Sequence, residues 1–543
     1  MKILKRNNII PAWFKNLFCF HLIALLFSCG NSSDRINDQL VFRYNEHKNI
    51  GSLDPAFAKD NADIWAVNQL FNGLVQMDEN LTVQPCIAEQ WSISEDALTY
   101  AFALRTDVQF HKDPIFGKDS TRQVTAHDFE YSLFRLCDFA TASPGSWVVN
   151  NLWDIEVKED SLKITLKSPD PSFIGKLTMK YCSVVPKEIV QHYKSGFRSH
   201  PIGTGPFKFK RWEENLKLVF RRNEHYFEFD KNGVQLPYLE AVAITFLPDK
   251  QSEFLQFAQG NIDFVSGLDA SYKDDILTAT GKLREIYSQD INMIRGPYLN
   301  TEYLAFFMDS KIPEIQSKVL RQAINYGFDK KKMMTYLRNG IGIPANGGFI
   351  PKGLPGYNSS AGFSFQPEKA KQLVQQFKAE TGISLPEITI TTTSNYLSFC
   401  EYIQRELQKI GILVNVDVIP AATLKDAKAN GKLDMFRASW VADYPDAENY
   451  LSLYASKNFA PNGPNYTHFK NKQFDRWYQE SLTLTNAKIR ESLYTKMDSL
   501  VMASTPIVPL FYDEVVRFTR KDVSGLGINP INLLDLKQVK KLN

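Results

Sequence analysis

Residues 388–419 read ITITTTSNYLSFCEYIQRELQKIGILVNVDVI, and this stretch decides the fold class. Both ends alternate apolar and polar residues, the period-2 pattern of half-buried strands. The valines on one face of the second strand are Val414, Val416 and Val418. Between the two strands, Ile403, Leu407 and Ile410 recur at helical spacing. Strand, helix and strand in this order predict a β-α-β unit.

Two further helices are expected in the same half of the chain. One begins at Pro367, a residue suited to the first helical turn, and ends before Gly382. The other covers residues 315–338, with apolar residues on one side. In the N-terminal half, residues 162–167 (LKITLK) alternate and predict a strand. The mixture of helices and strands predicts an α/β fold.

Composition excludes several classes of protein. The 543 residues are 44% hydrophobic, 23% charged and 13% aromatic, so collagen-like and disordered chains are excluded. The length predicts two to four domains with a sizeable core. The net charge of +3 depends on four basic residues near the N-terminus, and the chain from Cys29 onward carries 59 basic and 60 acidic residues. This balance argues against a nucleic-acid-binding protein.

The N-terminus has the features of a lipoprotein signal. Residues 17–27 (LFCFHLIALLF) are apolar except for His21, and they have the length of a signal-peptide core, not of a membrane span. Residues 26–30 (LFSCG) resemble the lipobox of bacterial lipoproteins, in which Cys29 receives the lipid. The polar residues 31–38 would then form a tether. An ordinary signal peptide with a chance cysteine is the alternative.

No later segment has the apolar length of a membrane span. We therefore expect a cell-envelope protein, held at the membrane by its lipid and facing the periplasm or the cell exterior. Four cysteines besides the anchor remain after processing, and three pairings are open to them. Free, buried thiols are favoured. These cysteines are Cys86, Cys137, Cys182 and Cys400.

Sequence motifs give no sign of an enzyme. The serine hydrolase, zinc protease, C-x-x-C, P-loop and EF-hand patterns are missing, and no two histidines have the spacing of a helical metal site. The glycines at residues 203–205 are followed by Pro206 and not by a helix, which argues against phosphate binding. We predict no catalytic residues, no metal and no cofactor.

One polar segment, residues 436–446 (FRASWVADYPD), is a candidate binding site. It brings the guanidinium of Arg437, the indole of Trp440 and the carboxylate of Asp443 within seven residues, ahead of a Tyr-Pro turn. Loops of this kind can direct side chains into a cleft. The alternative is a strand entering a turn, with Asp443 capping backbone amides and Arg437 solvated.

Several segments in order give the chain a family resemblance. They are LDP at 53–55, LFNGL at 70–74, AEQW at 88–91, YAFALR at 100–105, VTAHDFEYS at 124–132, GTGPF at 203–207, GNID at 260–263 and residues 437–444. Together they resemble the oligopeptide- and dipeptide-binding proteins of ABC importers, the extracellular solute-binding family 5. The resemblance covers essentially everything after the tether.

This resemblance implies an α/β, two-lobed periplasmic-binding-protein-like fold (type II, cluster C) with an extra α+β domain inserted in the first lobe. The expected division is a lipoprotein signal peptide at 1–28, a lipidated tether at 29–38, a first lobe of 39–80, 203–295 and 512–543, an inserted domain at 81–202, and a second lobe at 296–511.

The resemblance also implies a peptide-binding site. Asp443 matches the partner of the peptide α-amino group, and Arg437 matches a carboxylate-binding arginine. Ser439, Trp440 and Val441 match a stretch whose backbone pairs with the ligand as an added strand. The chain has Asn395, Tyr396 and Leu397 where oligopeptide binders carry a histidine, so the preferred peptide length stays open.

The implied function is capture of peptides between closing lobes by a monomer and their delivery to an ABC permease. The alternatives are another ligand of the family (chelated nickel, haem, an opine or an oligosaccharide), a cell-surface hydrolase, and a signalling or adhesion receptor. Asp443 together with Arg437 favours a zwitterion.

Overall fold

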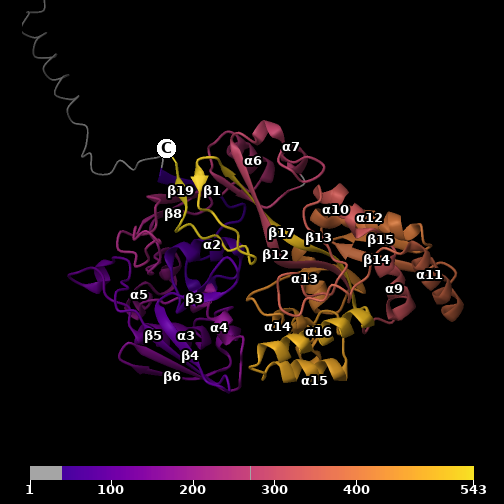
Figure 1. Ribbon diagram of the computed structural model, residues 1–543, viewed down its shortest axis with the longest axis horizontal. Coiled ribbons are helices and arrows are strands. Elements are labelled where there is room, and N and C mark those ends of the chain that lie inside the picture. Colours follow the sequence, from indigo (N-terminus) through magenta and orange to yellow (C-terminus); the bar gives the residue numbers. More distant parts are fainter. Residues whose placement is uncertain (1–39, 270, 543) are drawn as a thin grey trace, which may run out of the picture.

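The computed structural model describes residues 40–269 and 271–542 (Figure 1). The predicted signal peptide, the lipid anchor at Cys29 and most of the tether lie outside these residues, and so remain predictions. Within the described ranges, no helix combines the length and the apolar character needed to cross a bilayer.

A long mixed sheet runs through the molecule. Its main path is β15 (Leu413–Val418), β14 (Glu387–Thr392), β16 (Met435–Val441), β12 (Ile291–Phe306), β17 (Ile507–Arg520), β11 (Phe264–Ser266), β1 (Val41–Asn45), β10 (Ala241–Thr245), β9 (Lys217–Arg222) and β8 (Phe207–Glu213). A short strand, β13 (Ile343–Pro344), pairs with β17 outside this path.

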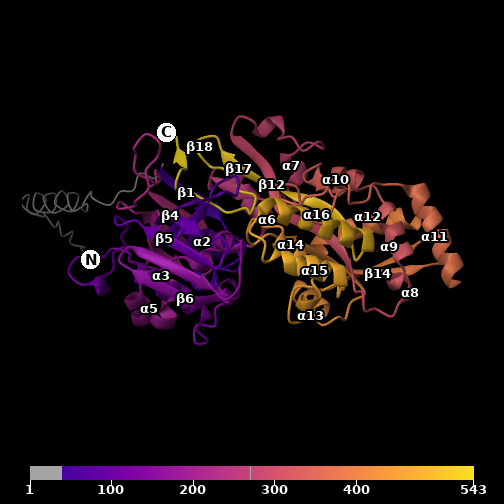
Figure 2. The ribbon, with the colours of Figure 1, turned by 60° about the horizontal axis from the view of Figure 1, so that its bottom comes forward.

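Two long antiparallel strands, β12 and β17, join the two halves of the molecule (Figures 1 and 2). At one end β17 pairs with β11, and at the other β12 pairs with β16. Their pairing is irregular between Pro297 and Thr301, where the strands pass from one half to the other. We call the half built on β1 and β8–β11 lobe I, and the half built on β14–β16 lobe II.

The predicted β-α-β unit is confirmed in lobe II. Strands β14 and β15 are parallel neighbours, and α12 (Leu397–Gln408) connects them with Ile403 and Leu407 buried. The helix predicted from Pro367 is α11 (Pro367–Thr381), which ends at Gly382 in a left-handed conformation with φ 76°. A glycine adopts this conformation without strain, which explains the sharp end of the helix.

The single helix predicted over residues 315–338 is wrong. The structure has three helices there: α8 (Pro313–Gln316), α9 (Lys318–Tyr326) and α10 (Lys330–Arg338). Two N-caps divide the run, because Ser317 accepts a hydrogen bond from the backbone N–H of Leu320 and Asp329 accepts one from that of Lys332.

Two cores cover lobe II. One contains α9, α11 and α12 packed against the sheet, and includes Leu320, Phe377 and Ile403. The other contains α14 (Glu448–Leu451), α15 (Lys472–Ser481) and α16 (Ala487–Ser504), and includes Tyr450 and Met497. Helix α13 (Ala421–Ala429) precedes β16.

Lobe I collects segments from distant parts of the chain. Its core joins β1, α2 (Asn61–Leu70), β8–β10 and C-terminal residues such as Leu534 and Val539. Helices α6 (Lys250–Ala258) and α7 (Lys273–Ile276) form a smaller core with β11 and β17.

A four-stranded antiparallel sheet lies between β1 and β8 in the sequence. Its order is β4 (Ala88–Ile93), β5 (Thr99–Leu104), β7 (Ser161–Leu166) and β6 (Leu152–Lys158). The strand predicted at residues 162–167 is β7. Helix α3 (Ala126–Cys137) covers the sheet and shares its core with residues 177–184. Helix α5 (Lys187–Tyr193) follows, and its Ile189 and Val190 pack into the core of lobe I. We call this unit the side domain.

The four cysteines of the described residues are free, as expected from the sequence. Cys86, Cys182 and Cys400 are buried, and burial raises the pKa of each thiol. Cys137 is exposed, so the expectation of burial is wrong for that one residue.

Candidate functional site

A cavity of about 250 Å³ lies where lobe I, the side domain and lobe II meet. Lobe I contributes residues of α2 and of the C-terminal segment, and the side domain contributes Lys180 and Tyr181. Lobe II contributes Val441, Ala442 and Asp443 at the end of β16. A site shared in this way changes shape when the lobes move relative to one another.

Asp443 is the acidic group that lobe II places in this cavity. It is accessible to water there, but the protein packed around it partly desolvates the carboxylate and raises its pKa. Its carboxylate accepts a hydrogen bond from the side-chain amide of Asn449 at 3.3 Å. No lysine, arginine or histidine of residues 40–269 and 271–542 forms an ion pair with it.

Asn449 fixes the geometry around Asp443. It is 4% exposed, in α14, and its side-chain oxygen accepts hydrogen bonds from the Trp440 indole at 2.8 Å and from the Asp443 backbone N–H at 3.3 Å. The indole therefore holds the loop in place. No backbone amide donates to the Asp443 carboxylate among the described residues, so the alternative of a capping role finds no support.

The outer edge of β16 is open next to Asp443. The N–H of Ala442 donates to the carbonyl of Leu299 on β12, and antiparallel pairing alternates, so the backbone of Trp440 also faces β12. The backbone groups of Ser439 and Val441 face the other side. There β14 reaches only Phe436. Among the described residues no strand pairs with Ser439 or Val441 on that side, so pairing of a ligand there stays a prediction. Ser439 and Trp440 do not line the cavity, and the Trp440 indole is bonded to Asn449.

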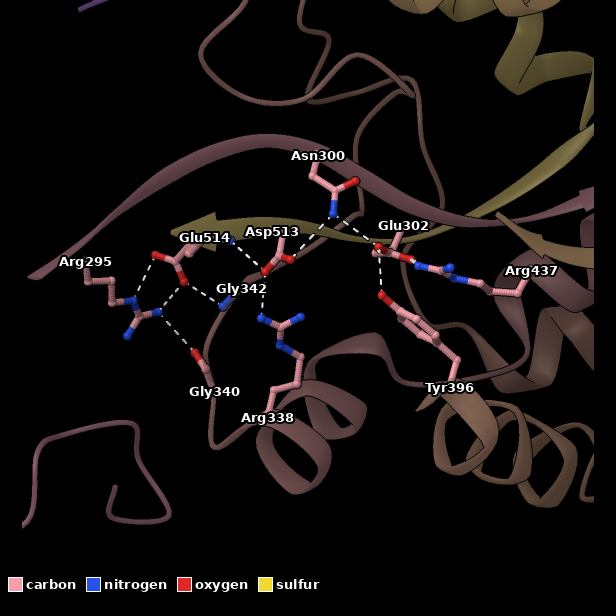
Figure 3. A network of polar contacts seen from close by, with 10 residues as sticks. All are labelled: Arg295, Asn300, Glu302, Arg338, Gly340, Gly342, Tyr396, Arg437, Asp513 and Glu514. Carbon is pink, nitrogen blue, oxygen red and sulfur yellow. Dashed lines mark hydrogen bonds and ion pairs between the residues drawn. The ribbon is translucent and has the colours of Figure 1, made fainter. Parts of the chain in front are cut away.

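Arg437 is already paired (Figure 3). Its guanidinium donates to Glu302 on β12, with the Nε contact at 3.0 Å, and lies 3.4 Å from the ring centre of Tyr396. Asn300 and Tyr396 also donate to Glu302. Arg437 does not line the cavity, and it lies four residues from Val441 along β16, about 13 Å. A ligand carboxylate would have to displace Glu302 to bind it.

The polar contacts continue along the strands that join the lobes. Asn300 donates to Asp513 at 3.5 Å, and Arg338 donates to the same carboxylate at 2.6 Å. Arg295 forms a second ion pair, with Glu514. The Glu514 carboxylate also accepts a hydrogen bond from the backbone N–H of Gly342 at 2.6 Å. The charges in this network are balanced, which leaves none over for a ligand.

Two contacts bring the side domain against lobe II beside the cavity. The rings of Trp147 and Tyr444 lie 6.3 Å apart, and the Lys176 ammonium lies 5.2 Å from the ring centre of Tyr444. The carboxylate of Asp443 also faces Tyr181. Burial and then this charge raise the pKa of Tyr181 to about 12.

Sequence reasoning missed Lys180, Tyr181 and Asn449. Asn449 could have been found as an amide side chain six residues after Asp443. Nothing in the local sequence pattern singles out Lys180 and Tyr181. In the described ranges, no group of three or more His, Cys, Asp or Glu side chains is arranged to hold a metal ion.

Comparisons with known proteins add to this geometry. Residues 82–462 match the family model described as bacterial extracellular solute-binding proteins, family 5 Middle. The chain is 27% identical to heme-binding protein A of Haemophilus influenzae over 467 residues, which are 81% of each chain. It is 25% identical to probable di/tripeptide-binding protein 5 of Pseudomonas aeruginosa over 502 residues, 87% of this chain and 89% of that protein.

A solved structure shares the fold. It is the ABC transporter-associated periplasmic binding protein DppA from Helicobacter pylori, in complex with the peptide STSA. Its TM-score is 0.75 at 24% identity, and the match covers 93% of this chain and 98% of that chain. The two-lobed α/β architecture, side domain included, is therefore common to both.

Proposed function

Since the chain belongs to the bacterial extracellular solute-binding proteins of family 5, we propose that it binds short peptides between its lobes and delivers them to an ABC permease. Membership confirms the resemblance drawn from the sequence. On this proposal the chain is a binding protein and not an enzyme, a monomer without metal or cofactor, and it is anchored in the cell envelope through Cys29. We retain the predicted domain borders as part of the proposal.

The observation that carries the proposal is Asp443, an acid without a cationic partner in a cavity between lobes. Partial desolvation of its carboxylate costs free energy, which a bound ammonium group offsets. A peptide α-amino group is protonated near neutral pH and carries this charge. The open backbone edge at Ser439 and Val441 lies beside it and offers main-chain hydrogen bonds that do not depend on the ligand's side chains.

Relatives support a peptide, although their names also include other ligands. One relative is named as a probable di/tripeptide-binding protein, and the DppA structure contains a peptide. Another relative is named as a heme-binding protein, and a solved structure of the fold contains nickel with histidine. An unpaired acid favours a ligand with an ammonium group over haem, which has none.

The test compares matched peptides. We expect Asp443→Asn to weaken binding of a free-amine peptide about tenfold and to leave its N-acetylated form nearly unchanged, because only the first has an ammonium group. Isothermal titration calorimetry of the full chain measures both. Asp417→Asn, which removes an exposed acid from β15, is the control.

Equal losses for the free and acetylated peptides would reject the role of Asp443. Native mass spectrometry of the purified protein identifies any ligand that is retained in the cavity. Recovery of haem or a metal chelate in place of a peptide would replace the proposed ligand class.

A further inference from the structure

The cavity contains a second charge without a partner, the ammonium group of Lys180. This residue begins the short helix η5 (Lys180–Cys182), which packs into the core of the side domain through Tyr181 and Cys182. Lys180 is partly buried and lines the cavity. Its ammonium group forms no hydrogen bond or ion pair with any residue of the described ranges.

The other cations of the cavity differ from Lys180. Lys537 is paired with Glu228 at 2.8 Å and lies 3.8 Å from Asp535. Lys59 is exposed, so water solvates it. Lys180 is desolvated by its surroundings, which lowers its pKa; the charge of Asp535, which also lines the cavity, acts against this shift, and the charge of Lys537 adds to it. Among the three lysines that line this cavity in the described part of the chain, Lys180 alone is both desolvated and unpaired.

The cation expected from the sequence to bind a ligand carboxylate is Arg437, and the structure gives it a different partner. Glu302 is 2% exposed and forms an ion pair with Arg437. Arg437 lies about 13 Å along β16 from Val441, which lines the cavity. A ligand that exchanged Glu302 for its own carboxylate would leave Glu302 buried and unpaired, which is costly. A ligand carboxylate that binds Lys180 displaces no buried partner and so avoids this cost.

We propose that Lys180 binds the carboxylate of the ligand, so that the cavity recognises a short zwitterionic peptide by its two ends, with Asp443 at the ammonium and Lys180 at the carboxylate. This inference rests on the proposed function and adds the residue and the ligand length. The cavity of about 250 Å³ lies just below the roughly 300 to 1,000 Å³ typical of ligand pockets, which favours a dipeptide or tripeptide.

The experiment uses Ala-Leu and Ala-Leu-Ala, each as the free acid and as the C-terminal amide, titrated into the full chain by calorimetry at neutral pH. We expect the wild-type protein to bind the acids about tenfold more tightly than the amides, because the amide gives Lys180 no charge to pair with. Lys180→Met should weaken binding of the acids to the level of the amides and leave the amides unchanged.

Two variants serve as controls. Lys59→Met removes an exposed cation from the same cavity and should keep the preference for the acid. Arg437→Met tests the residue that the sequence favoured. Thermal unfolding shows whether Lys180→Met folds, and we expect it to be at least as stable as the wild type, because an unpaired, desolvated cation is removed.

Four results would overturn the inference. The wild type could bind acids and amides equally well, or the preference for acids could survive in Lys180→Met. Either result would show that Lys180 does not bind the ligand carboxylate, and would leave the proposal of peptide binding intact. Loss of the preference only in Arg437→Met assigns the carboxylate to Arg437. No binding of any peptide by the wild type would reject the proposed function, and this inference with it.

Discussion

Glu302 is predicted to be the most sensitive single position of the polar network between the lobes. It is 2% exposed and its carboxylate accepts hydrogen bonds from Arg437, from Asn300 at 3.1 Å and from Tyr396 at 3.4 Å. Glu302→Gln leaves the Arg437 guanidinium, whose side chain is 14% exposed, without its counter-charge. Breaking a buried pair in this way costs about 3 to 5 kcal/mol.

We expect the cost of Glu302→Gln to lie at the lower end of this range. The Tyr396 ring, 3.4 Å from the guanidinium, continues to stabilise the cation, and a glutamine still accepts one hydrogen bond. We therefore expect a loss of about 3 kcal/mol in the unfolding of lobe II. For a domain of this size that lowers Tm by roughly 6 to 12 °C, measured by differential scanning calorimetry.

A double-mutant cycle shows whether the pair is the cause. Glu302→Gln and Arg437→Met together remove both charges, so the double variant should lose about 2 kcal/mol less than the sum of the single losses. The exposed pair of Lys163 and Glu156, at 2.8 Å, is the control, and Lys163→Met should cost under about 1 kcal/mol. Additive single losses below about 1 kcal/mol would refute the reasoning.

Two further predictions concern pH and anchoring. Burial raises the pKa of Asp498 to about 7, so this group stabilises the fold fully below about pH 4 and loses that contribution as the pH rises to 7. Between pH 4.5 and 7.5 the Tm of the wild type should therefore fall more, or rise less, than the Tm of Asp498→Asn, and equal changes in the two proteins would contradict this. Cys29→Ala should move the protein from the membrane fraction to the supernatant after ultracentrifugation, and continued membrane retention would argue against the lipobox.

Local patterns predicted the local structure. The β-α-β unit of β14, α12 and β15 and the ends of α11 depend on periodicity, Pro367 and Gly382, all of which are visible in one short window. The helix predicted over residues 315–338 failed for an equally local reason. Its apolar spacing continues through Ser317 and Asp329, but their side chains cap backbone amides and start new helices.

The candidate site depended on contacts between distant residues, and these could not be predicted. Asp443 lies in the cavity as its loop position suggested. The counter-charge of Arg437, however, is 135 residues away on β12, and the two strands meet only in the folded sheet. Lys180 reaches the same cavity from the side domain, so no sequence pattern links it to Asp443.

The two unpaired charges stand on opposite sides of the junction between the lobes. Asp443 follows β16 of lobe II, and Lys180 belongs to the side domain, which packs on lobe I. On our proposal, a zwitterionic peptide pairs one charge with each side, so its binding free energy favours the arrangement in which both sides reach it. A ligand with one charged end satisfies one lobe and leaves the other charge desolvated and unpaired. On this proposal the same two ion pairs recognise both termini of the peptide and hold the lobes closed on it. Blocking either terminus should therefore weaken closure as well as affinity.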